Sequence, residues 1–272
     1  MDNDANNQVI LCKIANRAMD IANKKLELDQ LYAEDFRGSA SNSNQFVREE
    51  WITGEIALEL RLNFASYVKT ELFTAQTEAK NGADWYWCIQ VGDLSIHAHV
   101  QAKRIQRSYF GQPDKDGIVE LDTEQIEKLL DSAEVKKKVI PGLQTWIATY
   151  ARFNATPPCR KNPASCDIHG CGLACEGVMR QPSIWIAKAA DFAKYGRPRK
   201  TMRTAEIIQN SIRLDCFLPC IESSTIASGP VGPMVKNFAL TPNLMSYESS
   251  IEAIRGDSAL SDEFKGALQI KI

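Results

Sequence analysis

Apolar residues recur three and four positions apart in two stretches near the start of the chain. The first stretch covers residues 7–29 and the second covers 46–68. The second stripe consists of Ile52, Ile56, Leu60 and Phe64. This spacing is typical of amphipathic helices that pack on a core. Because a polar loop at 38–44 separates them, we expect an N-terminal helix and linker followed by a second helix.

A β-hairpin is predicted in the middle of the chain. Residues 84–91 are rich in aromatic and β-branched types, Gly92-Asp93 follow, and 94–105 continues with strand-forming residues. Two such runs joined by a two-residue loop are typical of antiparallel strands. Glycine in the first loop position favours a type II′ turn, which fixes the register of the two strands.

The register of this hairpin brings polar residues together. The expected opposed pairs are Val91 with Leu94, Tyr86 with His99, and Asp84 with Gln101. Opposed residues share a face of the sheet, with Cβ atoms about 5 Å apart. Lys103 lies two positions beyond Gln101 and therefore points to the same face. We expect Asp84, Gln101 and Lys103 to converge, with Trp85 and Trp87 on the opposite face.

A further helix and strand follow the hairpin. Asp122, with Gln125 three positions later, resembles a capping box, and the apolar positions after it have helical spacing. The expected buried face consists of Ile126, Leu129, Leu130 and Ala133. Pro141-Gly142 interrupts the chain before an apolar run at 143–153, which predicts a strand. With a short strand near Phe73, the pattern predicts an α/β protein.

Composition and charge are those of an ordinary globular protein. The chain has 272 residues, 44% of them hydrophobic and 24% charged, with a formal net charge of −2. This charge gives no overall attraction to nucleic acid, so any such affinity must come from a local patch. The start of the chain lacks the basic and apolar regions of a secretory signal, and no apolar run approaches the roughly 20 residues of a membrane helix. We expect a cytoplasmic protein that does not enter a membrane.

The converging residues suit metal-assisted cleavage of a phosphodiester bond. Carboxylate, amide and carbonyl oxygens are the ligands that Mg²⁺ and Mn²⁺ prefer, and an ammonium group assists the attacking water. We expect Asp84 to be the main ligand, with Gln101 and the backbone carbonyl of Ala102 adding oxygens. Lys103 would position or deprotonate the water. An ordinary solvated pair of Asp84 and Lys103 is the alternative.

The order of these residues resembles a known superfamily. An acid, a hairpin and then Gln-x-Lys is similar to the PD-(D/E)XK nucleases, in the glutamine-bearing variant of Mrr-like restriction endonucleases. Glu78, the run Gly82-Ala-Asp-Trp-Tyr-Trp87 and the run Gln101-Ala-Lys-Arg104 also resemble a bacterial family that we associate with this superfamily. The likeness covers residues 46 to about 154, and Gly170–Ala174 more loosely.

The resemblance implies a fold and a division of the chain. It implies a restriction-endonuclease-like α/β fold, with an αβββαβ core whose mixed central sheet is flanked by helices. We expect an N-terminal helix and linker at 1–44 and the nuclease core at 45–155. A Cys-containing C-terminal region, 156–272, would pack on that core.

Two further carboxylates are candidates for the same site. Glu49 lies in the middle of the apolar stripe, where a charge needs compensation, and the resemblance implies a helix glutamate that completes the site. The alternative is an acid favoured by the helix dipole in the first turn. Glu78 could reach the metal or cap a loop. Because Gln101 replaces the usual acid, Glu49 and Glu78 would restore the missing negative charge.

Two histidines share the strand face of Gln101 and Lys103. Alternation places His97 and His99 there, where they could contact phosphate or a second metal ion. A satisfied polar residue is the commoner role of such a histidine, and we give neither a catalytic role.

A cysteine cluster marks the C-terminal region. Structural Zn²⁺ needs four soft ligands, and five stand close together in the sequence. They are Cys159, Cys166, His169, Cys171 and Cys175. Their spacing matches no paired CxxC pattern, so buried or free thiols are the alternative to a zinc site.

A basic segment is the candidate surface for nucleic acid. Residues 194–203 carry five positive charges and no acid. The four that we expect to contact a phosphate backbone are Arg197, Arg199, Lys200 and Arg203, together with Arg104 beside the site. A solvated loop is the alternative.

These features together predict a Mg²⁺- or Mn²⁺-dependent endonuclease that hydrolyses phosphodiester bonds of DNA. By analogy with Mrr-like relatives, we expect a role in bacterial defence against foreign DNA. A homodimer would supply two sites for cutting both strands. The alternatives are a module of the same fold that only binds nucleic acid, and a zinc-stabilised interaction protein whose hairpin is structural.

Overall fold

The computed structural model describes residues 2–35, 47–92, 94–105, 118–151, 184–193, 199–203 and 211–220. The helices are α1 (Asp2–Asp35), α2 (Glu49–Asn63), α3 (Ala75–Asn81), α4 (Thr123–Lys136) and α6 (Leu214–Cys220). The strands are β1 (Val68–Leu72), β2 (Trp85–Val91), β3 (Leu94–Arg104), β4 (Ile118–Asp122), β5 (Gln144–Tyr150), β6 (Ile184–Lys188), β7 (Arg199–Arg203) and β8 (Ile212–Arg213). A short 3₁₀ helix, Ala189–Asp191, follows β6.

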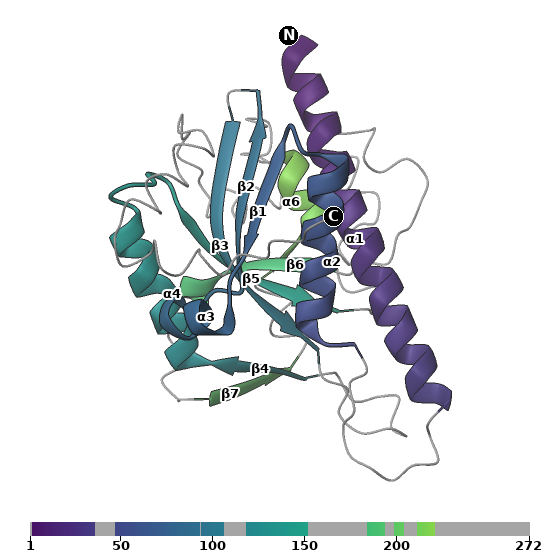
Figure 1. Cartoon of the computed structure of the whole chain (residues 1–272), viewed down its shortest axis with the longest axis vertical. Coiled ribbons are helices and arrows are strands. Elements are labelled where there is room, and N and C mark those ends of the chain that lie inside the picture. The colour runs from purple at the N-terminus through teal and green to yellow at the C-terminus, as the bar shows by residue number, and fades with distance from the viewer. Residues whose placement is uncertain are drawn as a thin grey trace.

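A mixed sheet lies at the centre of the molecule, with the strand order β1-β2-β3-β5-β6-β8. β3 and β5 run parallel, and the other neighbours in this sheet are antiparallel. α1, α2 and α6 cover one face, and α3 and α4 cover the other (Figure 1). Apart from two insertions, α3 after β1 and β4 after β3, the order α2-β1-β2-β3-α4-β5 confirms the predicted αβββαβ core of an α/β protein.

Alternation along the strands separates the core into two sides. The larger side, toward α1 and α2, contains Trp85, Trp87 and Trp146. The opposite side, toward α4, contains Tyr86 and Ile147. Removing these side chains from water is the main driving force for folding. Trp85 and Trp87 therefore lie on the predicted side, away from the polar face of β3.

Both N-terminal helices form, with bounds that differ from the prediction. α1 extends past 7–29 at both ends. α2 begins at Glu49 and ends at Asn63, so the predicted span of 46–68 was too long. The helical spacing of apolar residues continues after Asn63, but Val68 enters β1 and pairs with Ile89 of β2. Strand pairing decides the conformation of this segment, because its side chains fit a pleated, half-buried surface.

The hairpin has the predicted register. Val91 is paired with Leu94, and Tyr86 is paired with His99. Gly92 has a φ of 58°, in the left-handed region that a tight hairpin turn requires and glycine tolerates. Asp93 lies outside the described residues.

The helix α3 and the β4–β7 pair were not predicted. The side chain of Thr74 caps α3 by accepting a hydrogen bond from the backbone of Thr77, and α3 ends at Gly82 with a φ of 70°. β4 and β7 form a separate antiparallel pair, in which Asp122 lies opposite Arg199. Pairing between segments so far apart leaves no local signal in the sequence.

Part of the C-terminal region extends the central sheet. β6 pairs with β5, and β8 pairs with β6. α6 adds apolar side chains to the core beneath α1 and α2. The rings of Phe217 and Trp146 pack nearly perpendicular to each other, with a centroid distance of 5.0 Å. Segments on either side of residue 156 thus share one sheet and one core.

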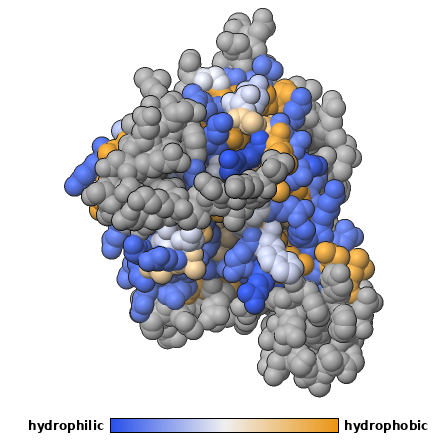
Figure 2. Space-filling model, in the orientation of Figure 1, coloured by the Kyte–Doolittle hydropathy of each residue, from blue (hydrophilic) through white to orange (hydrophobic). Residues whose placement is uncertain are grey.

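The surface is mixed in character. Figure 2 shows hydrophilic side chains over much of the face that carries α2, with apolar patches between them. Trp51, Leu58 and Leu62 of α2 are among the exposed apolar residues. In the part of the chain that the structure describes, no helix is long and apolar enough to cross a membrane.

Candidate active site

The site forms where two strands of the hairpin separate. The last paired residue of β2 is Trp85, opposite Val100, whereas β3 continues to Arg104. On its other side β3 remains paired with β5 as far as Arg104 and Tyr150. The edge of β3 after Val100 therefore faces the residue that precedes β2. That residue is Asp84, and its carboxylate accepts a hydrogen bond from the backbone N–H of Ala102.

Asp84 is an acid held in a poorly solvated position. Burial raises its pKa well above the ordinary value of 3.8, and the nearby carboxylates of Glu78 and Glu49 raise it further. The ammonium of Lys103 and the N–H of Ala102 oppose this rise by stabilising the charged form. The net rise in pKa shows that burial, with the two neighbouring carboxylates, outweighs the stabilisation of the charged form by Lys103 and the Ala102 N–H.

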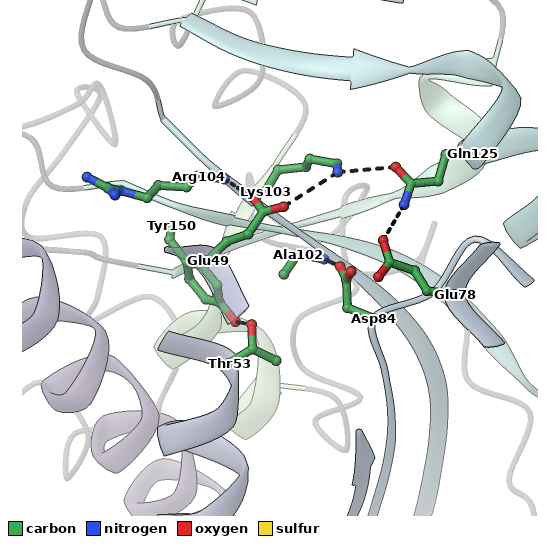
Figure 3. Close-up of polar contacts among 9 residues, drawn as sticks. All are labelled: Glu49, Thr53, Glu78, Asp84, Ala102, Lys103, Arg104, Gln125 and Tyr150. Carbon is green, nitrogen blue, oxygen red and sulfur yellow. Dashed lines mark hydrogen bonds and ion pairs between the residues drawn. The ribbon is translucent and has the colours of Figure 1, made fainter. Parts of the chain in front are cut away.

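Lys103 lies between groups from two different helices. Its Nζ is 3.8 Å from Oε1 of Glu49, at the start of α2. It also donates a hydrogen bond of 3.3 Å to Oε1 of Gln125, on α4. The lysine side chain is only 13% exposed, so its position is fixed by these partners rather than by solvent. Figure 3 shows the three side chains extending toward one another from separate elements.

Glu49 reaches the site from the first residue of α2. Its Oε2 accepts a hydrogen bond of 3.0 Å from the backbone N–H of Arg104. Burial raises the pKa of Glu49, and Lys103 and the Arg104 N–H partly counteract this effect. Its neighbour Glu50 is exposed, and Glu55 forms an ion pair with Lys25. The choice of Glu49 among these acids therefore agrees with its position beside β3.

Glu78 approaches from the opposite side of the site. It lies on α3, and its Oε1 accepts a hydrogen bond of 2.9 Å from the side-chain amide of Gln125. The contribution of Glu78 to the raised pKa of Asp84 shows that the two carboxylates act on each other. Glu78 belongs to the helix α3, from which its side chain points toward Asp84 and Gln125 (Figure 3).

Gln125 is the residue of this site that the sequence did not reveal. Its pattern with Asp122 predicted a capping box, and Asp122 does cap α4 by accepting from the backbone N–H groups of Glu124 and Gln125. The side chain of Gln125 itself contacts Lys103 and Glu78.

Gln101 is buried on the same strand face as Lys103. The residue is fully buried, and neither its amide oxygen nor its amide nitrogen has a hydrogen-bond partner. Buried polar atoms without a hydrogen-bond partner are uncommon in folded proteins. The expected role of Gln101 as a neutral ligand beside Asp84 stays a prediction.

The donor set fits a divalent cation only if neutral oxygens take part. In the described part of the chain, no group of three or more His, Cys, Asp or Glu side chains is close enough to hold a metal ion. Asp84 and Glu49, whose pKa values are both raised, would need the amide of Gln101 or the carbonyl of Ala102 as further ligands. Oxygen ligands of this kind are those that Mg²⁺ and Mn²⁺ accept.

The two histidines of β3 lie outside this arrangement. His97 is a satisfied buried residue, since its ring nitrogens are bonded to the hydroxyls of Tyr86 and Ser95. His99 is completely buried, and burial lowers its pKa well below the ordinary value of 6.5. His97 therefore matches the satisfied polar residue of the prediction, whereas both ring nitrogens of His99 lack a hydrogen-bond partner among the described residues.

Arg104 does not lie where a nucleic-acid contact requires it. Its guanidinium forms a buried ion pair with Asp29 of α1 and donates to the backbone carbonyl of Val47. Asp29 in turn accepts a hydrogen bond of 3.0 Å from the N–H of Val47. The prediction for Arg104 overlooked Asp29, and we assign this arginine a structural role at the entry to α2.

The remaining predicted residues are described in part or not at all. Arg199, Lys200 and Arg203 belong to β7, of which the structure describes the backbone but not the side chains. Arg197 and the cysteine cluster lie outside the described residues. The four cysteines concerned are Cys159, Cys166, Cys171 and Cys175.

Comparison with known proteins gives a family but no activity. Residues 22–260 match the model of a family described as a family of unknown function (DUF6615). The chain belongs to this family. No curated protein matches it. The match begins within α1 and extends past α6, so the family includes both the site and the strands that the C-terminal region adds to the sheet.

Proposed function

We propose that this DUF6615 protein is a metal-dependent nuclease that hydrolyses phosphodiester bonds of DNA. The observation that carries the proposal is the arrangement around three consecutive residues of β3. Ala102 donates to Asp84, Lys103 lies between Glu49 and Gln125, and Arg104 donates to Glu49. Carboxylates from two other elements thus converge on the segment that carries the lysine.

Assignment of the proposed nuclease to a superfamily rests on the order of its helices and strands and on the spacing of its site residues. The αβββαβ order, the acid before β2 and Gln101-Ala-Lys103 on β3 support membership of the PD-(D/E)XK superfamily, in its Mrr-like variant. Mrr-like relatives suggest a role in bacterial defence against foreign DNA, by analogy only. A homodimer would allow both strands of a duplex to be cut.

Each residue of the site would have a distinct task. Asp84 and Glu49, with neutral oxygens from Gln101 and Ala102, would hold Mg²⁺ or Mn²⁺. The bound cation would polarise the phosphate and lower the pKa of an attacking water. Lys103 would orient that water and stabilise the charge that develops on the phosphate. Glu78 would act through its neighbours, since its described hydrogen bond is to Gln125.

A cleavage assay with matched variants tests the proposal. Linear and circular DNA would be incubated with the protein in Mg²⁺, in Mn²⁺ and in chelator. Asp84→Asn keeps an oxygen that can accept from Ala102, and Lys103→Met keeps the length of the side chain. Each should lower the cleavage rate at least 100-fold, because it removes a metal ligand or the essential positive charge. Asp131→Asn and Lys138→Met, both at exposed positions, serve as controls.

The alternatives predict different results. A module that only binds DNA would retain salt-dependent binding but show no cleavage and no Asp84-dependent cation binding. A zinc-stabilised interaction protein would unfold in chelator and show neither property. Cleavage by Asp84→Asn at the rate of the unchanged protein would refute the nuclease site directly.

A further inference from the structure

The side-chain amide of Gln125 lies between a cation and an anion of the site. Its Oε1 accepts from the ammonium of Lys103 at 3.3 Å, and its Nε2 donates to the carboxylate of Glu78 at 2.9 Å. Figure 3 shows the chain of contacts running from Glu49 through Lys103 and Gln125 to Glu78. One amide therefore joins β3 to α3.

An amide is well suited to this position. It can accept a hydrogen bond from a positive group at one end and donate one to a negative group at the other. A carboxylate would accept from Lys103 but repel Glu78, and an apolar side chain would serve neither. Hydrogen bonds to charged groups are also shorter and stronger than those between neutral groups.

Two features fix the backbone that carries this amide. Asp122 caps the start of α4 with hydrogen bonds of 3.0 Å to the N–H of Glu124 and 3.4 Å to the N–H of Gln125. Gly82, at the end of α3, packs directly on α4. A Cβ added to Gly82 would lie 2.2 Å from the backbone oxygen of Gln125. This close approach brings Glu78, one turn earlier in α3, within reach of the amide.

We propose that Gln125 is a positioning residue that holds the ammonium of Lys103 and the carboxylate of Glu78 in fixed places beside Asp84. This inference rests on the proposed nuclease function. Gln125 would not contact the substrate or a metal ion. Its effect would come from the geometry of Lys103, since a displacement of about 1 Å in a catalytic group can lower a rate about 100-fold.

The first test separates positioning from stability. Gln125→Leu removes both hydrogen bonds while keeping a similar size, and Gln76→Leu makes the same change at an exposed position of α3. We expect Gln125→Leu to lower kcat about 10- to 100-fold, with KM changed less than about twofold and the folded fraction unchanged. Gln76→Leu should leave kcat and KM unaltered. A wild-type kcat in Gln125→Leu would overturn the proposal.

The second test exchanges the side-chain types of Gln125 and Glu78 and measures stability, so it needs no enzymatic activity. Gln125→Glu alone places two carboxylates against each other and should lower the urea midpoint of unfolding. Adding Glu78→Gln lets the new amide at position 78 donate to the new carboxylate at position 125, the reverse of the original hydrogen bond. The carboxylate at position 125 can still accept from Lys103, and the net charge returns to its original value. The double variant should therefore recover most of the midpoint. A double variant no more stable than Gln125→Glu would contradict the contact.

The two tests also distinguish this inference from the proposed function. Absence of DNA cleavage by the unchanged protein in every divalent cation would refute the nuclease proposal. The exchange of partners would still decide whether Gln125 holds Glu78, because unfolding is measured without substrate. Cleavage by the unchanged protein, with normal kcat in Gln125→Leu, would leave the function standing and remove Gln125 from it.

Discussion

Oε2 of Glu49 accepts a hydrogen bond of 3.0 Å from the backbone N–H of Arg104. This contact joins the first residue of α2 to the residue after Lys103. It places a carboxylate beside the ammonium without the help of a loop. Sites built on helices and strands hold their geometry more closely than sites on loops.

Neutralising Glu49 should affect cation binding more than folding. Glu49→Gln keeps an oxygen that can accept from Arg104, but it removes a charge whose pKa is raised mainly by burial. We expect weaker Mn²⁺ binding by calorimetry and stability equal to or above that of the unchanged protein at pH 7. Glu50→Gln, at an exposed position, is the control. Equal Mn²⁺ affinity in the two variants would remove Glu49 from the ligand set.

Stability should fall as pH rises through the pKa of Asp84. Burial raises that pKa in the folded protein above its ordinary value of 3.8, so the folded state binds a proton more tightly than the unfolded chain. The free energy of unfolding must then decrease from about pH 4 upward until Asp84 is fully ionised. Asp84→Asn should remove this decrease and raise the urea midpoint at pH 8. Parallel pH curves for the two proteins would contradict the burial of this charge.

The buried ion pair of Arg104 and Asp29 should be essential for stability. Asp29→Asn leaves the guanidinium without its charged partner in a buried position, which typically costs about 3–5 kcal/mol. Urea unfolding measures this loss, with Asp131→Asn as the exposed control. Replacing both partners by apolar residues, Asp29→Leu with Arg104→Met, should recover part of it. A loss below about 1 kcal/mol in Asp29→Asn would indicate a solvated pair.

The basic strand β7 should contribute to DNA binding. Its residue Arg199 is paired with Asp122, which caps the helix that carries Gln125. Neutralising Arg197, Arg199 and Lys200 should reduce the slope of log Kd against log salt concentration by about 0.9 for each phosphate that the protein no longer neutralises. Neutralising the exposed lysines Lys13, Lys24 and Lys128 is the matched control. The same slope in both triple variants would exclude β7 from the interface.

The local geometry of the hairpin made part of the site predictable. A two-residue loop with glycine first sets the register, and a period of two sets the face, so Lys103 and Asp84 could be placed from the sequence alone. Glu49 could be placed because a carboxylate on an apolar stripe requires a partner. The succession of helix, hairpin, helix and strand followed from such local patterns, whereas the complete αβββαβ core was implied by the resemblance.

Contacts between distant elements could not be predicted in this way. The role of Gln125 depends on how α4 packs against α3, whereas its sequence context indicates only a cap. Arg104 has the sequence context of a surface residue, but it is buried by Asp29, which lies 75 positions earlier. The helix α3 is an exception, because its local signals are present in the sequence: Thr74 as a cap and Gly82 at its end.

The position of a divalent cation tests the nuclease proposal most directly. Crystals of the protein soaked in Mn²⁺ would show the ion by its anomalous scattering. We predict one peak within coordination distance of the Asp84 carboxylate, next to Lys103, and no such peak in Asp84→Asn. An unchanged protein that shows no peak at saturating Mn²⁺, or a peak remote from Asp84, would contradict the proposed site.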